Sequence, residues 1–170
     1  MANSHLIPTY KRQPIAFERG EGAWLFDSQG ERYLDALSGI AVNTLGHAHP
    51  ALVEAIADQA GRLLHTSNLY EIDVQTRLAD RLCEVAGMDA VFFGNSGSEA
   101  NEAAIKLARL HGHKRGIDKP VVVVMENSFH GRTLAALAAT GNANAQKGFE
   151  PLPEGFLRVP YGDLDAIAAL

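Results

Sequence analysis

The sequence predicts an α/β protein, and three observations support this prediction. Apolar residues recur at helical spacing after Pro50 and again after Asp73. From residue 90 onward, short apolar runs alternate with helical patterns, as in proteins whose strands and helices follow one another in layers. The unbroken run 121–124 consists of four valines, which favours a strand covered on both faces in a parallel sheet flanked by helices.

The first 64 residues predict a β-hairpin followed by a helix. Residues 23–27 and 32–36 form the two strands, with Gly30 free to adopt the positive φ that such loops often need. Trp24 and Phe26 are expected to pack the hairpin. Pro50 opens the helix, and its apolar face must be buried against another element. That face consists of Leu52, Val53, Ile56, Ala57, Ala60, Leu63 and Leu64.

The remaining residues predict a second helix and then an alternation of strands and helices. Asp73 can cap the helix that Gly87 ends in a left-handed conformation. Asp163 begins a last helix whose apolar pattern runs to Leu170 without a C-terminal signal, so the chain is expected to be cut there. The polar segment 141–155 is expected to be a loop. The predicted strands are 90–93, 121–125 and 156–159, and the predicted helices between them are 98–111 and 132–139.

Composition excludes several classes of function. With 46% apolar and 21% charged residues, the 170-residue chain is an ordinary globular protein. A formal charge of −5 and scattered Lys and Arg argue against nucleic-acid partners. The single cysteine, Cys83, excludes a disulfide framework within one chain and is expected to be a buried thiol. With no secretory signal and no long apolar run, we expect a cytoplasmic protein without a membrane partner.

The segment from Asn95 to Glu102 is the most informative, because small residues lead from a predicted strand directly into a helix. The free N–H groups of a helix N-terminus attract anions, and Gly97 would allow close approach to the backbone. The hydroxyls of Ser96 and Ser98 could donate to phosphate oxygens. The alternative is that Ser96 and Glu99 form a capping box that serves only the helix. The segment matches neither a P-loop nor GxGxxG.

A second candidate segment, 126–133, follows the valine strand. Ligands of α/β proteins gather beyond the carboxyl ends of strands, so both segments are expected to meet at one crevice. Phe129 could stack on a flat ring, Gly131 would permit close approach, and Arg132 could hold a carboxylate with its two-pronged guanidinium. The alternatives are core packing for Phe129 and a solvated helix start for Arg132.

No metal site is expected from the histidines or from other residues. His47 and His49, with His65, have no clustered carboxylate or cysteine, and an HxH pair is weak evidence for a metal. Helix capping or packing is the expected role of these histidines. The five lysines are expected to be surface charges. They are Lys11, Lys106, Lys114, Lys119 and Lys147.

These residues together resemble the class III aminotransferases, which belong to the fold-type I enzymes that use pyridoxal phosphate, and among them most closely the acetylornithine aminotransferases. The resemblance covers nearly the whole chain. It rests on Trp24-Leu25-Phe26-Asp27, Tyr33-Leu34-Asp35, the segments 38–43 and 46–50, His65 to Tyr70, Asn95 to Arg109, and Ser128 to Thr133.

The resemblance implies a division of the chain and a set of site residues. Residues 1–64 would be part of the small domain, and residues 65–170 the first part of the cofactor-binding large domain, whose mixed sheet is incomplete here. Gly97 and Ser98 would hold the phosphate of pyridoxal 5′-phosphate, with Phe129 against its ring and Arg132 on the substrate carboxylate. Ser96 and His130 are counted as further cofactor-binding residues.

The resemblance also implies the reaction. The expected donor is N-acetylornithine and the expected acceptor 2-oxoglutarate, in arginine biosynthesis, because ornithine aminotransferases have a tyrosine where this chain has Ile40. Ornithine, succinyl-ornithine, succinyl-diaminopimelate and 4-aminobutyrate remain alternative donors. A homodimer is expected of the whole protein. No catalytic residue is expected in this chain, because the lysine that forms a Schiff base with the cofactor would lie beyond it.

Two functions of other classes remain open. One is a catalytically inactive fragment that keeps only binding or oligomerisation surfaces. The other is a nucleotide-binding α/β domain that uses the serine-rich segment 96–98.

Overall fold

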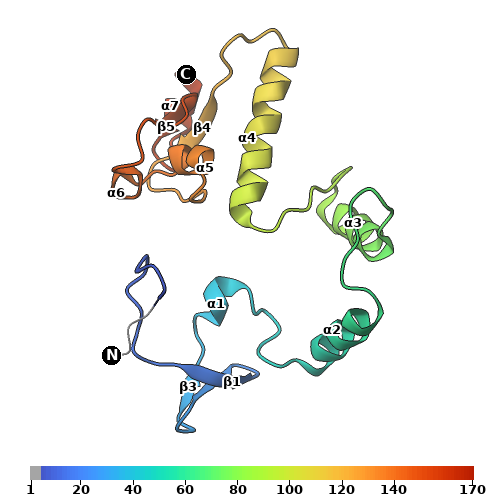
Figure 1. Cartoon of the computed structure of the whole chain (residues 1–170). Helices are drawn as coiled ribbons and strands as arrows, with labels where there is room; N and C mark the ends of the chain where they lie inside the picture. The colour runs from blue at the N-terminus through green and yellow to red at the C-terminus, as the bar shows by residue number, and fades with distance from the viewer. Residues whose placement is uncertain (1–4) are drawn as a thin grey trace. The chain divides into compact units, whose positions relative to one another are not determined.

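The computed structural model describes residues 5–170, which form two compact units, one ending at Ile72 and one running from Asp73 to Leu170 (Figure 1). The predicted domain boundary between residues 64 and 65 falls in the segment 63–72, which contains no helix or strand. The boundary between the compact units therefore lies eight residues further along the chain than the predicted one.

A three-stranded antiparallel sheet opens the first unit. Its strands are β1 (Phe17–Glu21), β2 (Trp24–Asp27) and β3 (Arg32–Leu34), in that order. The predicted hairpin is confirmed as β2 and β3, with Gly30 at a φ of 84°. Strand β1 was not predicted, because its sequence Phe-Glu-Arg-Gly-Glu lacks an apolar alternation.

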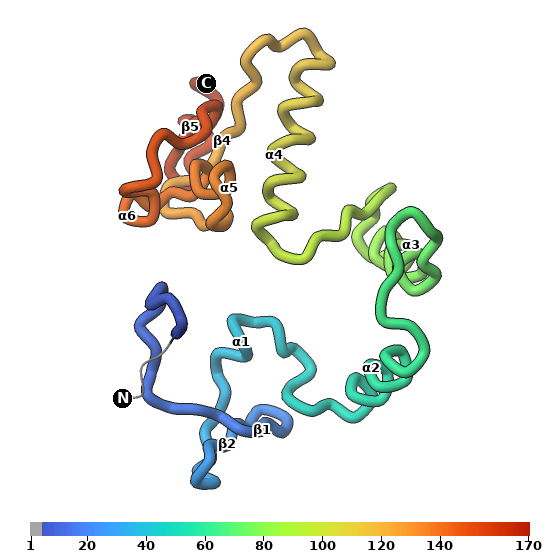
Figure 2. The backbone as a smooth tube through the Cα atoms, in the orientation of Figure 1, coloured from blue at the N-terminus to red at the C-terminus, as the bar shows by residue number. Residues whose placement is uncertain are grey.

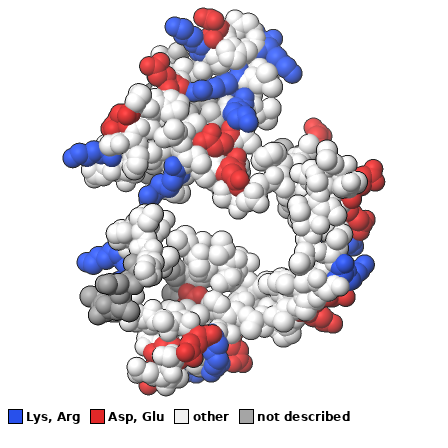
Figure 3. Space-filling view, viewed as in Figure 1, with Lys and Arg blue, Asp and Glu red and all other residues white. Residues whose placement is uncertain are grey.

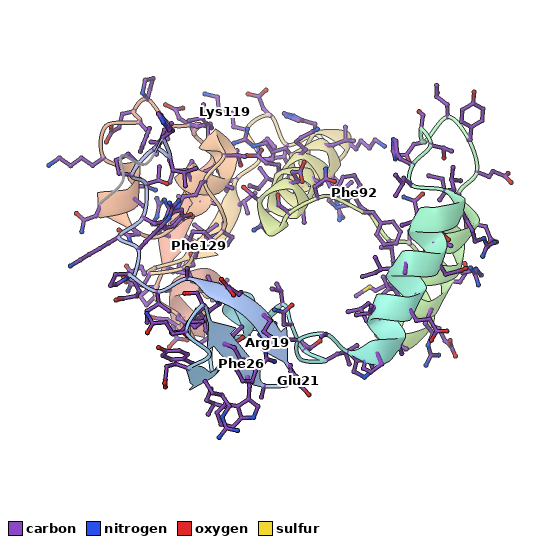
Figure 4. All side chains as sticks on the ribbon, turned by 60° about the horizontal axis from the view of Figure 1, so that its bottom comes forward. Arg19, Glu21, Phe26, Phe92, Lys119 and Phe129 are labelled. Atoms are coloured by element: carbon purple, nitrogen blue, oxygen red, sulfur yellow. The ribbon has the colours of Figure 1, made fainter. Side chains whose placement is uncertain are left out.

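Arginines cover two of the aromatic side chains of this sheet. The guanidinium of Arg19 lies 3.5 Å from the ring centre of Phe26, and that of Arg32 lies 4.2 Å from the ring centre of Trp24. Figure 4 shows Arg19 and Phe26 on the sheet. Trp24 and Phe26 therefore pack against the arginines of neighbouring strands.

A left-handed turn, α1 (Ser38–Ala41), follows β3. Its four residues have φ values of 51°, 64°, 65° and 61°, although only Gly39 lacks a side chain. This conformation costs roughly 1–2 kcal/mol for each L-residue. Hydrogen bonds to one carboxylate oxygen of Asp35 stabilise its start, since the N–H groups of Leu37 and Ser38 donate to it at 3.1 and 2.7 Å.

The other carboxylate oxygen of Asp35 lies 2.7 Å from Nε2 of His47. This hydrogen bond, followed by the one from the Ser38 N–H, holds the pKa of Asp35 below its ordinary value of 3.8. The ring of His47 fills the space beside Gly20, where a Cβ would approach its Cγ to 2.5 Å. The packing role expected for this histidine is confirmed.

Acid should weaken this arrangement. The pKa of Asp35 is lower in the folded chain than in the unfolded one, so its contribution to stability is complete above pH 3.8 and disappears as the pH falls through the folded pKa. We therefore expect Asp35→Asn to destabilise the whole protein near neutral pH and progressively less below about pH 4. Urea unfolding of both proteins across that range measures this, and a difference independent of pH would contradict it. Asp58→Asn, at an exposed ion pair with Arg62, is the control.

Two helices follow, α2 (Pro50–Arg62) and α3 (Asp73–Ala86), and both were predicted. Gly87 ends α3 with a φ of 63°, as expected. The apolar face predicted for α2 is not buried among the described residues, since Ile56 is 60% and Leu64 84% exposed. Cys83 on α3 is half-buried, so the expectation of a buried thiol is wrong.

The second unit contains the predicted alternation of helices and strands. Its β4 (Val122–Met125) pairs in parallel with β5 (Phe156–Val159), placing Val122 opposite Phe156. Figure 2 traces the backbone from the end of α4 back into β4. Asp163 caps the last helix, accepting a hydrogen bond from the N–H of Ala166 at 2.8 Å. Besides α3, the helices of this unit are α4 (Gly97–Lys114), α5 (Leu134–Ala139), α6 (Ala143–Gln146) and α7 (Leu164–Ala168). Helix α6 lies within the segment predicted to be a loop.

The core of this unit lies between the helices and one face of its sheet. Ile105 of α4, Val124 of β4 and Ala139 of α5 form it, each at most 7% exposed. On the other face, Val123 is 36% and Leu157 39% exposed. The prediction that both faces of the valine strand are covered is wrong for the described chain, because α4 and α5 pack on the same face.

The predicted strand at residues 90–93 is also absent. This segment has no ladder of hydrogen bonds, because no strand in the described residues pairs with it. An apolar run can indicate a strand, but the strand forms only where a neighbouring strand provides hydrogen bonds.

Charges of both signs are interspersed on the face of the second unit visible in Figure 3. Within residues 5–170, no helix is long and apolar enough to cross a membrane.

Candidate functional site

Two segments from different parts of the second unit meet at one pocket of about 560 Å³. One is the N-terminal end of α4 and the other is the loop between β4 and α5. The predicted convergence of the two candidate segments is therefore confirmed. The pocket is lined by Gly97, Ser98, Asn101, Phe129, His130, Gly131, Arg132 and Thr133.

Ser96 begins α4 as its N-cap. Its hydroxyl oxygen accepts a hydrogen bond from the N–H of Glu99 at 3.2 Å, and its hydroxyl donates to the Glu99 carboxylate at 3.1 Å. Hydrogen bonds from Asn95 and then Ser96 hold the pKa of Glu99 below its ordinary value of 4.5. The capping box is thus present, and Ser96 does not line the pocket. Its predicted contact with a cofactor stays a prediction.

The capping box leaves two backbone donors free. In the described chain, the N–H groups of Gly97 and Ser98 have no acceptor, as expected for the first positions of a helix. A Cβ built at Gly97 would meet no atom within 4 Å, so a ligand can approach the backbone there. The two functions proposed for this segment are therefore compatible, because different residues perform them.

Removing the hydroxyl of Ser96 tests helix capping separately from ligand binding. We expect Ser96→Ala to lower the free energy of unfolding of the whole protein by about 1 kcal/mol, because one helix donor loses its acceptor. The affinity for a phosphorylated ligand should change less than about threefold, since the free N–H groups of Gly97 and Ser98 remain. Urea unfolding and equilibrium titration measure the two effects. A loss of affinity without a loss of stability would instead place Ser96 on the ligand.

Hydrogen bonds fix the loop between β4 and α5. The hydroxyl of Ser128 donates to the carbonyl of Met125 at 2.6 Å, and the N–H of His130 donates to Thr140 Oγ1 at 3.0 Å. Thr140 is 1% exposed and also donates its hydroxyl to the carbonyl of Ala136. The loop therefore presents its side chains from a rigid base.

Phe129 and Arg132 project from this base into the open. Phe129 is 69% exposed, so it does not pack in a core among the described residues. The guanidinium of Arg132 lies 5.9 Å from the ring centre of Phe129, and no carboxylate of residues 5–170 forms an ion pair with it. Figure 4 labels Phe129 on this loop. The ring and the guanidinium are thus both available to a ligand.

The backbone of His130 links the loop to α4 and to Thr140 by hydrogen bonds. Its carbonyl accepts a hydrogen bond from Asn101 Nδ2 at 2.7 Å, and its Nδ1 lies 3.3 Å from the hydroxyl of Ser128. The ring lines the pocket beside Phe129.

Sequence reasoning did not single out Asn101 and Thr133, which also line the pocket. Asn101 follows Gly97 by four residues, so the helical repeat places both on one side of α4 and could have indicated it. Thr133 lies at the start of α5, and its contact with Ser98 could not be read from spacing. The five lysines are exposed as predicted, and none lines this pocket. Among residues 5–170, no group of three potential metal ligands was found.

The lining fits a phosphorylated aromatic molecule together with a second ligand that carries a carboxylate. Two free N–H groups at the start of α4 suit a phosphate, the exposed Phe129 ring suits a flat heterocycle, and Arg132 suits a carboxylate. Pyridoxal phosphate and an amino acid have these features.

Comparison with known sequences gives the same picture. The family model described as Aminotransferase class-III matches residues 7–169. An acetylornithine aminotransferase of Nitrosomonas europaea is 62% identical over 96% of the chain, and acetylornithine aminotransferase 1 of Bordetella pertussis is 57% identical over 98%. The chain spans 42% of the length of each of these relatives.

Solved structures of aminotransferases are similar to this chain as well. An ornithine aminotransferase of Toxoplasma gondii superposes on 97% of this chain with a TM-score of 0.92 and 30% identity, and the chain covers 40% of it. An N-acetylornithine aminotransferase of Stenotrophomonas maltophilia superposes on 94% of this chain with a TM-score of 0.75 and 35% identity, and the chain covers 39% of it. Another structure of the Toxoplasma protein contains pyridoxal phosphate at partial occupancy in the active site.

These matches confirm the expected fold, an incomplete fold-type I α/β transferase, and pyridoxal phosphate as the cofactor expected of the family. They cover nearly every residue that the structure describes, including both segments of the pocket. The chain belongs to the class III aminotransferases.

Proposed function

We propose that the whole protein transfers the amino group of N-acetylornithine to 2-oxoglutarate, in arginine biosynthesis. The observation that supports this best is the 62% identity to an acetylornithine aminotransferase over a stretch that includes the complete pocket. We further propose that the whole protein acts in the cytoplasm as a homodimer, without a membrane or nucleic-acid partner.

Three groups of the reactants have a binding residue in this proposal: the cofactor phosphate, the cofactor ring and the donor carboxylate. The N–H groups of Gly97 and Ser98 bind the cofactor phosphate, and Phe129 lies against the cofactor ring beside His130. Arg132 binds the carboxylate of the amino donor. Pyridoxal phosphate, when bound, supplies the electron sink that lets the amino group leave the donor. The protein holds the reactants in register and excludes water around them.

The choice of donor follows from Ile40. This side chain is 80% exposed and belongs to the first unit, on the left-handed turn α1. It has no hydroxyl to bind a free ornithine, so an acylated donor is favoured. Ornithine is the second candidate, because the ornithine aminotransferase of Toxoplasma gondii superposes with a TM-score of 0.92.

Initial rates across a panel of donors test the proposal in the whole protein. The panel consists of N-acetylornithine, succinyl-ornithine, succinyl-diaminopimelate, ornithine and 4-aminobutyrate, each with 2-oxoglutarate. N-acetylornithine should give the highest kcat/KM. A higher value for ornithine would favour the second candidate, and a higher value for 4-aminobutyrate would refute both.

The 170 residues alone are proposed to be inactive. Their five lysines are all exposed and lie outside the pocket, so none is placed to bind the cofactor covalently. Treating this chain with pyridoxal phosphate and borohydride should attach the cofactor to no single lysine. Stoichiometric attachment at one lysine, with transaminase activity, would refute this.

A further inference from the structure

Glu102 links the two segments of the pocket without belonging to either binding group. It lies half-buried on α4, and one of its carboxylate oxygens serves two donors from the start of α5. These donors are the hydroxyl of Thr133, at 2.5 Å, and the N–H of Ala136, at 3.2 Å. The carboxylate therefore joins two elements that are more than 30 residues apart in the sequence.

The chemistry of this carboxylate sets the direction of the hydrogen bonds. An ionised carboxylate only accepts, so the single hydroxyl proton of Thr133 is directed at Glu102. Thr133 Oγ1 also lies 3.1 Å from Ser98 Oγ. Because Thr133 has no second proton to give, Ser98 is the donor in that contact. Glu102 thus directs the Ser98 hydroxyl at Thr133 and ties Ser98 to the loop, which leaves the N–H groups of Gly97 and Ser98 as the donors for a phosphate.

The other side of the pocket is held by different residues. Asn101 Nδ2 donates to the carbonyl of His130 at 2.7 Å, and Thr140 accepts from the N–H of the same residue. The backbone next to Phe129 is therefore held by hydrogen bonds that do not involve Glu102. One set of contacts ties Ser98 to Thr133, and another holds the loop beside Phe129.

We infer that Glu102 is a positioning residue for the phosphate end of the pocket, acting through Thr133 on Ser98. This inference rests on the proposed function, because it assumes that the helix end binds the phosphate of pyridoxal phosphate. It requires that loss of Glu102 weakens the binding of the phosphate and leaves the binding of the ring nearly unchanged. Ser98 would then no longer be held against Thr133, so the N–H groups of Gly97 and Ser98 would lose their fixed position.

The selective loss of phosphate binding can be measured with two ligands that differ only in the phosphate. The dissociation constants of pyridoxal phosphate and pyridoxal are determined by titration of the cofactor-free whole protein and its variants. Glu102→Ala should raise the constant for pyridoxal phosphate about tenfold, the size expected for losing hydrogen bonds to a charged group, and that for pyridoxal less than about twofold. Glu102→Gln keeps an oxygen acceptor in the same place and should restore the affinity to within about threefold.

Further variants separate positioning from a general loss of structure. Thr133→Val removes the linking hydroxyl but keeps the Glu102 hydrogen bond to Ala136, so it should reproduce the selective loss even if Glu102→Ala does not fold. Asn101→Ala should weaken both ligands alike, since it releases the aromatic side. Glu84→Ala, whose carboxylate pairs only with exposed Arg81 on α3, should change neither.

The outcomes are distinguishable. If the wild-type protein binds pyridoxal phosphate no better than pyridoxal, the proposed function fails. If it prefers pyridoxal phosphate but Glu102→Ala and Thr133→Val leave that preference over pyridoxal unchanged or increase it, only the positioning role is refuted. A Gln variant as weak as the Ala variant would also refute positioning by hydrogen bonds.

Discussion

Gly131→Ala is expected to lower the free energy of unfolding by about 2–4 kcal/mol and to disrupt the cofactor pocket with it. Gly131 is buried and has a φ of 135°, which L-residues rarely adopt. A Cβ at this position would approach the Ser98 Cβ to 2.8 Å and the Ala136 Cβ to 3.1 Å. The steric conflict thus falls on Ser98, which lines the pocket and is proposed to bind the cofactor phosphate.

Two other glycines serve as controls for this prediction in denaturant unfolding. Gly148 has a φ of 88° but open space around its Cα, so Gly148→Ala isolates the cost of the backbone conformation, about 1 kcal/mol. Gly97 has open space and a helical position, so Gly97→Ala should keep the stability while blocking the ligand. If Gly131→Ala unfolds within about 0.5 kcal/mol of the wild type, the packing described here is wrong.

Gly131 also shows how far sequence reasoning reached. The sequence predicts that a glycine here permits the close approach of a ligand. In the structure the approaching group is the side chain of Ser98, from a helix 33 residues earlier in the sequence. Local patterns indicate that space is needed, but only the tertiary fold identifies what fills it.

Helices and strands could be predicted where a local sequence pattern alone determines where they begin or end. The valine run defined β4, and Pro50 and Gly87 defined helix ends, because these residues act on the local backbone, while Asp73 is the first residue of α3. The prediction of a strand at residues 90–93 is wrong, because a strand depends on a neighbouring strand to pair with. Strand β1 was missed for the opposite reason, since pairing with β2 stabilises a polar sequence.

The meeting of the two pocket segments could be predicted from the order of strands and helices in the sequence. Segments that follow parallel strands, or lead into the helices packed on them, meet at one edge of the sheet. This placed Gly97, Ser98, Phe129 and Arg132 together. Glu102 was missed because its carboxylate contacts residues 31 and 34 positions away, and no spacing rule connects them.

Arg132→Leu is expected to reduce kcat/KM for N-acetylornithine about 10²- to 10³-fold in the whole protein, mainly through KM. A bidentate, charge-assisted contact with a carboxylate contributes about 3–4 kcal/mol when the site is closed to water. Within the described chain Arg132 has no carboxylate partner, and its 5.9 Å separation from the Phe129 ring adds little, so the variant should fold normally. Steady-state kinetics and thermal unfolding of the same preparations test both statements.

The identity of the bound group can be tested by removing it from the substrate. If Arg132 binds the donor carboxylate, an amine without a carboxylate should react with the wild type and with Arg132→Leu at similar rates. Arg132→Lys should lie between them, because it keeps the charge but loses the two-pronged geometry. Arg115→Leu, at the C-terminal end of α4, is the matched control. Equal losses with both kinds of donor would mean that Arg132 supports the pocket rather than the substrate, and the carboxylate contact would have to come from another residue.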